Sequence, residues 1–352
     1  MITATQTFDA TDKALLTKVQ MGFPVEHRPY ARLGQDVGIS ETECIERIGR
    51  LKRDKVIRQL SAIFDTRSLG YRSTLVAMKV DSVQADEAAE IINQHPGVSH
   101  NYKRNDLFNI WFTIAVPPTD SLEKTVDILH ALTKADQTII LPTLRLYKIG
   151  VKLDLTGTGP TMESDEEIYN EQRRNAPKPP LQPRDIALIR VMQEDLPLVE
   201  VPFAVWAAQA EMTEPELLAW AAQMQQHNYM RRFAAILHHR SAGFIANAMV
   251  VWQVPEAQVD AIGEQLARFR QVSHCYRRPV YPDWPYPLFT MLHAPTHSAC
   301  MEMIVKMEAE VGQFPHKNLF STKEYKKIRL KYFAPELDEW WSRVGAQVNI
   351  VN

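Results

Sequence analysis

The hydrophobic and polar positions of the chain follow one order of helical and extended segments, and that order occurs twice. In its first occurrence, a short helix over 12–23, with Asp12 as its cap, comes before a helix over 40–55. A strand over 59–64 follows as a wing, so these elements predict a winged helix-turn-helix. The second helix is inferred from a capping-box pattern and a stripe at helical spacing, namely Ser40, Glu43, Ile45, Ile48 and Leu51.

The residues that follow have the order strand, helix, strand, strand, helix, strand, which is the ferredoxin-like motif. A tight turn at Asn105-Asp106 joins the middle two strands of the first copy into a hairpin. In the first copy we expect strands over 74–80, 98–104, 107–116 and 144–153, and helices over 82–94 and 121–135. In the second copy we expect strands near 246–254, 272–278, 287–293 and 320–330, and helices over 255–269 and 298–311.

Short motifs recur in the same order along the two halves, which indicates that the chain arose by duplication. The first motif recurs after 173 residues (240 − 67) and the last after 177 (289 − 112). Small changes in spacing of this kind are what loop insertions produce. The pairs are Arg67-Ser68-x-Gly70-Tyr71 with Arg240-Ser241-x-Gly243-Phe244, Val98-Ser99-His100-x-Tyr102 with Val272-Ser273-His274-x-Tyr276, and Phe112-Thr113 with Phe289-Thr290.

The repeat predicts an α+β protein, a tandem duplication of a winged helix-turn-helix followed by a ferredoxin-like (βαββαβ) domain. A stretch rich in Gly, Pro and charge separates the copies and is interpreted as a linker. The expected segments are a winged helix-turn-helix at 10–62, a ferredoxin-like domain at 63–154, the linker at 155–183, a second winged helix-turn-helix at 184–235, a second ferredoxin-like domain at 236–335 and a C-terminal tail at 336–352.

Composition narrows the class of protein. Apolar residues make up 45% of the 352, as in soluble globular proteins. No apolar run has the roughly 20 residues that a membrane helix needs, and the polar start lacks the apolar core of a signal peptide. The three cysteines have no metal-ligand or disulfide spacing, and the net charge is −2. We therefore expect a cytoplasmic protein that binds neither membranes nor polyanions in general.

A winged helix followed by such a domain resembles the Lrp/AsnC family of regulators, which implies DNA binding and ligand domains that pair sheet to sheet. A dimeric regulator reads two half-sites with two similar helices. In the first copy the helix expected to read DNA carries five cations, whereas the matching stretch over 214–229 has no Lys or Arg. Since phosphate contacts supply much of the affinity for DNA, a DNA-binding regulator is kept only as the alternative. The five cations are Arg47, Arg50, Lys52, Arg53 and Lys55.

A His-x-Tyr-x-Arg pattern at strand spacing occurs in both copies. Alternation along a strand places these side chains on one face. Aromatic rings beside cations suit a large flat ligand with many carboxylates, since rings cover its faces and Arg or Lys pairs with its acids. An aromatic sheet interface with exposed charges is the other interpretation. The residues expected on one face are Val98, His100, Tyr102 and Arg104 in the first copy and Val272, His274, Tyr276 and Arg278 in the second.

The hairpin motifs make the resemblance more specific. Val98-Ser99-His100-x-Tyr102 followed by the stretch 107–113 resembles one subunit type of the siroheme decarboxylases, and the stretches 274–279 and 283–286 resemble the other. A fused chain of both types is known in heme d1 biosynthesis. The resemblance implies removal of CO2 from the C12 and C18 acetates of siroheme, giving 12,18-didecarboxysiroheme. It implies no cofactor or metal site beyond the iron that siroheme carries. As partners it implies siroheme itself and either a second copy of the chain or paralogous decarboxylase subunits.

For this reaction we expect His100 and His274 to transfer protons or orient the substrate, because imidazole titrates near neutral pH. Ligation of the siroheme iron by one of them stays open, as does tetrapyrrole binding without turnover. The site is expected to be lined mainly by the second copy, whose aromatic-proline loop over 280–287 is interpreted as a lid. The expected substrate-binding residues are the carboxylate clamps Lys103, Arg104, Arg277 and Arg278, the rings Tyr102, Tyr276 and Trp284, and also Arg231 and His293.

Overall fold

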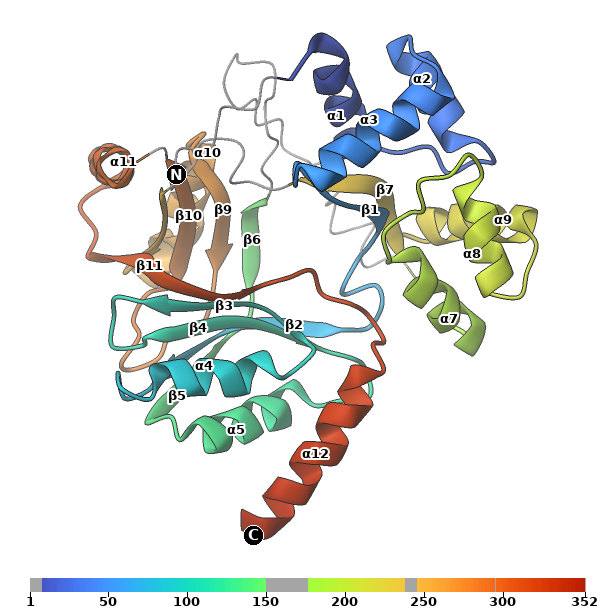
Figure 1. The fold of residues 1–352 in the computed structure, drawn as a ribbon. Helices are drawn as coiled ribbons and strands as arrows, with labels where there is room; N and C mark the ends of the chain where they lie inside the picture. Colours follow the sequence, from blue (N-terminus) through green and yellow to red (C-terminus); the bar gives the residue numbers. More distant parts are fainter. Residues whose placement is uncertain (1–7, 150–176, 238–245, 295, 352) are drawn as a thin grey trace. The chain divides into compact units, whose positions relative to one another are not determined.

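The computed structural model describes residues 8–149, 177–237, 246–294 and 296–351, and it groups them into two compact units (Figure 1). The first unit contains both helix-turn-helix segments, and the second contains both ferredoxin-like segments. Equivalent pieces of the two copies therefore fold together, and neither copy forms a separate body. The motif at 240–244 and the expected linker up to residue 176 lie outside the described residues.

In the first unit, β1 of the first copy pairs with β7 of the second in an antiparallel two-stranded sheet, which the helices of both copies flank (Figure 1). The predicted wing strand is thus present, but its partner comes from the other copy. The elements are α1 (Ala10–Met21), α2 (Pro29–Val37), α3 (Glu41–Arg53), β1 (Ile57–Phe64), α7 (Pro183–Met192), α8 (Pro202–Gln209), α9 (Glu214–Gln226) and β7 (Met230–Leu237).

The helix caps test the sequence patterns directly. Ser40 caps α3 as predicted, and its side chain accepts a hydrogen bond from the Glu43 amide. The prediction for α1 is wrong by three residues, because Asp9 is the cap and accepts from the Asp12 amide at 2.7 Å. Asp12 itself is buried in the first turn of the helix, where its carboxylate binds arginines of α3.

The second unit contains two βαββαβ segments, which confirms the predicted order. In the first copy they are β2 (Arg72–Lys79), α4 (Ala85–Asn93), β3 (Val98–Arg104), β4 (Ile110–Val116), α5 (Leu122–Thr133), β5 (Gln137–Leu141) and β6 (Arg145–Ile149). In the second copy they are β8 (Ala246–Trp252), η2 (Glu256–Gln258), α10 (Val259–Arg268), β9 (Val272–Arg277), β10 (Leu288–Ala294), α11 (His297–Val311) and β11 (His316–Lys327), followed by α12 (Glu336–Val351).

All nine strands of this unit form one sheet, in the order β5-β2-β4-β3-β11-β8-β10-β9-β6. The copies exchange their last strands. The first half of β11 pairs with β8 of its own copy and the second half with β3 of the first copy. In the same way β5 pairs with β2, while β6 pairs with β9 of the second copy. The strand expected over 144–153 is therefore not the fourth strand of its own domain. That strand is β5, and the chain breaks at Pro142 before β6 joins the other copy.

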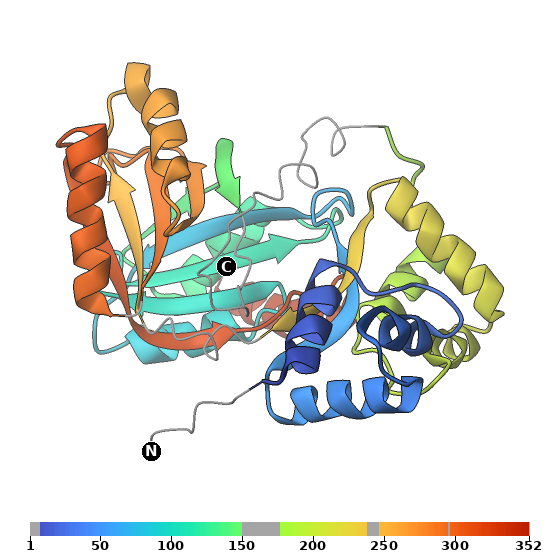
Figure 2. The same ribbon diagram turned by 90° about the horizontal axis from the view of Figure 1, so that it is seen from above.

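The buried residues of this unit form three apolar clusters. The first copy's helix-side core lies between its strands and α4 and α5, and the second copy's helix-side core lies against α10 and α11, which stand side by side in Figure 2. The inner core lies on the opposite sheet face and contains residues of both copies. The expected C-terminal tail is largely helical, because α12 places Trp340 and Val344 in the first copy's helix-side core. No helix within the described ranges combines the length and hydrophobicity needed to cross a bilayer.

Candidate active site

Each predicted histidine follows a β-bulge. In β3, Val98 pairs with Ile114 and His100 pairs with Thr113, so Ser99 is an extra residue between them. A bulge shifts the alternation of a strand by one position. Val98 therefore lies in the helix-side core, whereas His100 lies on the inner face. The prediction that Val98 and His100 share a face is wrong for this reason.

The second copy has the same bulge at the same place. Ser273 is the extra residue between Val272, which lies in the helix-side core, and His274. Beyond the bulge, Tyr276 lies opposite Phe289 of the inner core. His274 and Tyr276 are thus on the inner face, as their counterparts are in the first copy. The histidine and tyrosine predicted from each motif do share a face, and both copies present them alike.

The register of the hairpins corrects one of the repeat matches. Trp111 and Phe289 are the residues that lie opposite the tyrosines of the two copies. Trp111 is therefore the structural equivalent of Phe289. The match of Phe112-Thr113 with Phe289-Thr290 is out of register by one residue, since Phe112 lies in the helix-side core. With the register of the sequence match, the wrong residues of the facing strands would be placed opposite the histidines.

A serine, an imidazole and a phenol ring follow one another along each strand. In the first copy, His100 Nδ1 lies 3.0 Å from Ser99 Oγ, and its ring centre is 6.3 Å from that of Tyr102. In the second copy the corresponding distances are 2.9 Å and 6.0 Å. Both histidines are partly buried. The serine therefore contacts one nitrogen of each ring, and the tyrosine is the next side chain on the same face.

Two buried arginines complete this row. The guanidinium carbons of Arg104 and Arg278 lie 5.7 Å and 4.9 Å from the ring centre of the tyrosine on their own strand. Arg104 donates a hydrogen bond of 2.7 Å to the carbonyl of Leu319, and Arg278 donates to that of Leu141. Each arginine thus binds a backbone carbonyl of the opposite copy. Burial lowers the pKa of both guanidinium groups to about 10, so both remain charged at neutral pH.

These contacts favour a structural role for Arg104 and Arg278. Arg104 and Arg278 are only 6% and 9% exposed, and each links the two copies through its contact with a carbonyl. The other two predicted clamps, Lys103 and Arg277, lie on the opposite face of the strands. Arg277 binds Glu256 and approaches Asp260 at 3.5 Å on the helix side. Strand alternation therefore separates these cations from the histidines that they were expected to assist.

The aromatic-proline loop of the second copy is packed down, so the interpretation of it as a lid is wrong. Trp284 has no exposed surface, and its ring centre lies 5.2 Å from that of Trp111 and 5.6 Å from that of Phe108. The Tyr281 hydroxyl donates a hydrogen bond of 2.6 Å to the Ile140 carbonyl. The loop therefore fills the inner core between the copies, and Trp284 is a core residue.

The remaining two predicted residues lie in different units. His293 is two positions beyond Met291 in β10, and Met291 lies opposite His274, so the two histidines share the inner face. Arg231 lies in β7 of the first unit. Of the predicted residues, the structure therefore brings together His274, Tyr276 and His293 on one sheet face, with His100 and Tyr102 on the equivalent face of the other copy.

The sequence prediction missed the serines and the exchanged strands. Ser99 and Ser273 stood within the recurring motif, and the repeated Ser-His pair was the signal that could have identified them. Glu324 of β11 and Leu146 of β6 lie opposite the tyrosines of the two copies. No local pattern places them there, because their positions depend on the exchange of strands between copies.

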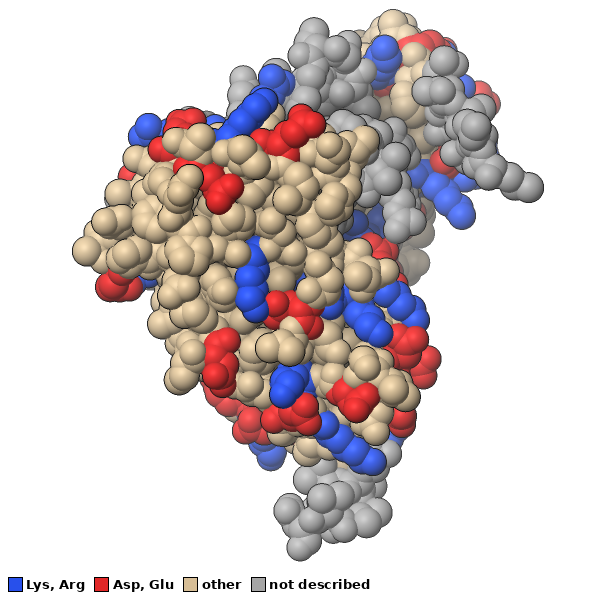
Figure 3. All heavy atoms as spheres, turned by 90° about the vertical axis from the view of Figure 1, so that its left-hand side faces the viewer, with Lys and Arg blue, Asp and Glu red and all other residues tan. Residues whose placement is uncertain are grey.

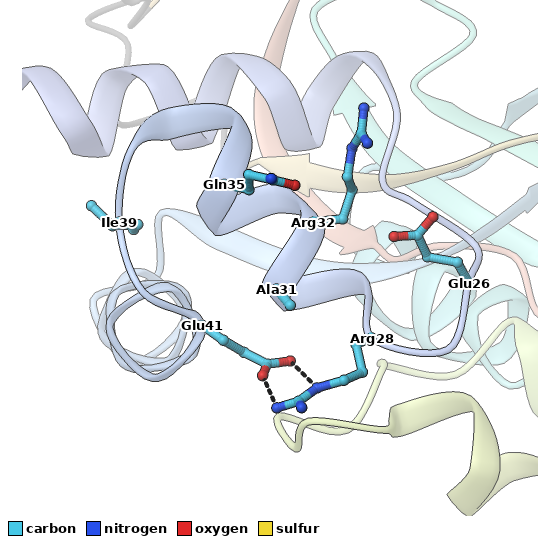
Figure 4. A pocket seen from close by; sticks show the side chains of 7 residues that line it. All are labelled: Glu26, Arg28, Ala31, Arg32, Gln35, Ile39 and Glu41. Atoms are coloured by element: carbon cyan, nitrogen blue, oxygen red, sulfur yellow. Dashed lines mark hydrogen bonds and ion pairs between the residues drawn. The ribbon is translucent and has the colours of Figure 1, made fainter.

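A hollow in the first unit does not suit an anionic ligand. It lies at α2 and α3 of the first unit, has a volume of about 610 Å³, and is open to solvent (Figure 4). Arg28 within it binds Glu41 and also Glu200, the latter at 2.9 Å. Its charge is thus already compensated. The hollow is lined by Glu26, Arg28, Ala31, Arg32, Gln35, Ile39 and Glu41.

The cations of α3 are largely engaged within the protein. Arg47 and Arg50 both bind the buried carboxylate of Asp12, and Lys52 binds Asp195 at 2.8 Å. These pairs lower the positive charge that α3 could offer to phosphates. On the face drawn in Figure 3, Lys and Arg are interspersed with Asp and Glu among the described residues. Neither observation favours the DNA-binding alternative.

Comparison with known proteins agrees with the fold and with the repeat. The model of the AsnC-like ligand binding domain matches residues 68–148 and 241–326. The model of the siroheme decarboxylase NirDL-like HTH domain matches residues 12–58 and 185–231. Both families match twice, which confirms the α+β duplication of a helix-turn-helix and an Lrp/AsnC-like domain.

Relatives and solved structures agree along the whole chain. The siroheme decarboxylase of Hydrogenobacter thermophilus is 37% identical over 94% of this chain and 97% of its own length. The siroheme decarboxylase alpha subunit of Nitratidesulfovibrio vulgaris is 45% identical over 42% of this chain and 84% of its own length. A crystal structure of the siroheme decarboxylase NirDL with an iron-uroporphyrin III analogue has a TM-score of 0.78 at 32% identity, covering 96% of this chain and 99% of that one. The prediction of a decarboxylating enzyme is thereby confirmed, and the chain belongs to the siroheme decarboxylase family.

Proposed function

We propose that this chain removes CO2 from the acetate side chains on C12 and C18 of siroheme and releases 12,18-didecarboxysiroheme in heme d1 biosynthesis. The proposal rests above all on one observation. A histidine and a tyrosine occur side by side on the inner sheet face of both copies. The surrounding chain is similar over 94% of its length to a siroheme decarboxylase.

The iron of siroheme enters with the substrate in this proposal, and no further cofactor takes part. The reaction is placed in the cytoplasm, in keeping with Cys44, Cys275 and Cys300, which are all free thiols. One chain carries counterparts of both subunit types, so a second copy is the partner to test. Light scattering of the purified protein decides between one copy and two.

The chemistry requires a proton for each CO2 that leaves. The bond between the methylene and carboxylate carbons breaks, CO2 departs, and the electron pair stays on the methylene carbon beside the pyrrole ring. A proton then converts that carbon to a methyl group. An imidazolium is suited to deliver this proton, because histidine titrates near neutral pH. After the transfer the imidazole is neutral and takes up a proton again before the next acetate reacts.

The second copy's histidine has the better surroundings for this step. Around His274, the inner face carries Met291 opposite it, Leu146 opposite Tyr276, and a second imidazole in His293. The equivalent neighbours of His100 are Thr113, Glu324 and Ala115. Met291 and Leu146 are apolar neighbours on the face of His274, whereas in the first copy Glu324 lies opposite Tyr102 and Lys327 lies opposite His100.

This difference in polarity supports a reaction site at His274. A carboxylate that leaves as CO2 is destabilised where water is scarce, whereas the neutral product is not. In our proposal His274 delivers the proton, His293 supplies protons to it from the same face, and His100 orients the substrate.

The first experiment measures turnover. Purified protein is given siroheme under anaerobic, reducing conditions, and the products are analysed by mass spectrometry. We expect a species lighter by one CO2 and later a species lighter by two. A change in the Soret band without loss of mass would instead mean binding without turnover. A chain that leaves the mass unchanged and binds a specific promoter fragment in a salt-dependent manner would be a regulator.

Matched variants separate the two histidines. We expect His274→Gln to lower the rate of CO2 release by about a hundredfold or more, because general acid catalysis typically contributes that much. His100→Gln is the control at the equivalent position and should cost less than about tenfold. Both variants should still shift the Soret band of siroheme. If only one variant abolishes a histidine-type spectrum of the bound iron, that residue ligates iron instead of delivering the proton. Equal rates for the two variants would refute the assignment of the site to the second copy.

A further inference from the structure

The serine before His274 differs from its counterpart before His100 in one contact. Ser273 is 3% exposed, and its hydroxyl lies 3.2 Å from the Met291 carbonyl and 2.9 Å from His274 Nδ1. Ser99 is less buried, and its hydroxyl lies 3.0 Å from His100 Nδ1. Within the described residues no carbonyl accepts a hydrogen bond from Ser99. The two copies thus share the Ser-His contact but differ in the second partner of the serine.

The extra contact favours one direction for the hydrogen bond between serine and imidazole. A hydroxyl has one hydrogen to donate, whereas a carbonyl oxygen can only accept. Since Ser273 donates to Met291, its oxygen is left to accept from His274. Both contacts of Ser273 are satisfied together only if the neutral ring carries its proton on Nδ1, which leaves the lone pair on Nε2. In the first copy the Ser99 hydroxyl has no competing acceptor and can donate to His100 or accept from it.

The bulge explains why a serine can do this. An extra residue in one strand interrupts the ladder of backbone hydrogen bonds. The Ser273 side chain lies at that interruption and binds the carbonyl of the facing strand. The facing backbone carbonyl therefore fixes the Ser273 side chain, which in turn fixes the orientation of the His274 ring. An aliphatic residue at this position would provide neither contact.

We infer that Ser273 is a positioning residue that keeps neutral His274 in the form protonated on Nδ1, so that Nε2 is the atom that delivers the proton and takes it back. The role of this proton in decarboxylation rests on the proposed function, whereas the protonation state of His274 does not. When the imidazolium gives its Nε2 proton to the methylene carbon, the ring is left in the form that Ser273 stabilises. Recharging then occurs at the same nitrogen. No ring flip is needed between the two decarboxylations.

Nitrogen NMR tests the protonation directly. Protein labelled with ¹⁵N in its histidines is examined above the pKa of the imidazoles, where long-range couplings distinguish the two neutral forms. His274→Gln assigns the signal. We expect His274 to be protonated on Nδ1 in the unmodified chain and in Ser273→Thr, which keeps the hydroxyl. Ser273→Ala should shift it towards the form protonated on Nε2. A wild-type ring protonated on Nε2, or no change in Ser273→Ala, would overturn the inference.

Turnover adds a second readout and a matched control. Loss of one hydrogen bond that selects the reactive form should lower kcat for CO2 release by about fivefold to tenfold in Ser273→Ala, with KM little changed. Ser273→Thr should restore most of this loss. Ser99→Ala, the matched variant in the first copy, should lower kcat less than Ser273→Ala does, because no carbonyl among the described residues accepts a hydrogen bond from Ser99. If the chain releases no CO2 at all, the proposed function fails, while the NMR result still decides the role of Ser273. Equal losses for the two alanine variants would refute the claim that the second copy's serine is distinct.

Discussion

Acid should destabilise the second unit through one buried histidine. His95 has no exposed surface, and its Nδ1 accepts a hydrogen bond of 2.9 Å from the Gly97 amide. Its ring packs edge to face against Trp340, with 4.4 Å between ring centres, and its Nε2 meets no donor or acceptor among the described residues. Burial, together with the positive charge of Lys326, lowers the pKa of His95 to about 3.

The sign and size of the effect follow from linkage. The unfolded histidine takes up a proton as the pH falls below 6.5, whereas the folded one stays neutral until about pH 3. The free energy of unfolding therefore falls with pH below 6.5. From there to pH 5 is about 1.5 units, and at about 1.4 kcal/mol per unit the loss is about 2 kcal/mol. Lys326, whose pKa burial lowers to about 8, is charged in both states over this range and adds no slope.

Urea unfolding at pH 7.5 and pH 5, followed by tryptophan fluorescence, measures the loss. His95→Gln is the matched variant, because glutamine can accept the Gly97 amide but does not titrate. The other histidines are the same in both proteins, so their contributions cancel in the comparison. We expect the wild type to lose about 2 kcal/mol more than the variant between the two pH values. An equal loss in both proteins, or a greater loss in the variant, would refute a neutral His95 in the core.

Three further predictions concern packing and charge, and urea unfolding checks each of them. Gly97→Ala should lower the free energy of unfolding by roughly 3 kcal/mol or prevent folding, because an added Cβ would lie 2.0 Å from the Ala115 carbonyl oxygen. A stable variant would show that the backbone at this position can shift to accommodate a side chain. Arg278→Ala should lower the free energy of unfolding by about 2–3 kcal/mol, because it leaves a cavity and removes the donor to the Leu141 carbonyl of the other copy. Unchanged stability with a raised KM for siroheme would instead support the prediction that Arg278 binds a substrate carboxylate. Asp12→Ala should cost about 3 kcal/mol, because two arginines of α3 lose their shared buried carboxylate; a neutral effect would mean that water replaces it.

Local patterns predicted most elements of the second unit. The strand expected over 98–104 is β3, and the helix expected over 298–311 is α11 to within one residue. Such agreement is physical, since side-chain alternation and helix caps act between residues close in the chain. The errors lie where distant segments compete for a partner. The strand expected over 144–153 begins in the right place, but its pairing with β9 was not visible from its own residues.

The candidate site likewise has features that local sequence patterns predicted and features that depend on contacts between distant segments. The recurring His-x-Tyr pairs predicted that the two rings share one face of their strand, and in both copies they do. The structure places the four predicted clamps in two ways. Lys103 and Arg277 occupy the other face by simple alternation, and Arg104 and Arg278 are held by carbonyls of the opposite copy. Ser273 had a visible signal in the repeated Ser-His pair, but its role depends on the Met291 carbonyl across the bulge.

The sequence by itself determined the duplication, the βαββαβ order, the histidine pair and the resemblance to siroheme decarboxylases. These properties follow from residue types and spacings, which do not depend on contacts between distant segments. Only the tertiary structure decided that the copies exchange strands, that a bulge turns each histidine to the inner face, and that Trp284 fills the core. A bulge or an exchanged strand is chosen by the partner strand, because unpaired backbone groups must find hydrogen bonds wherever the whole fold provides them.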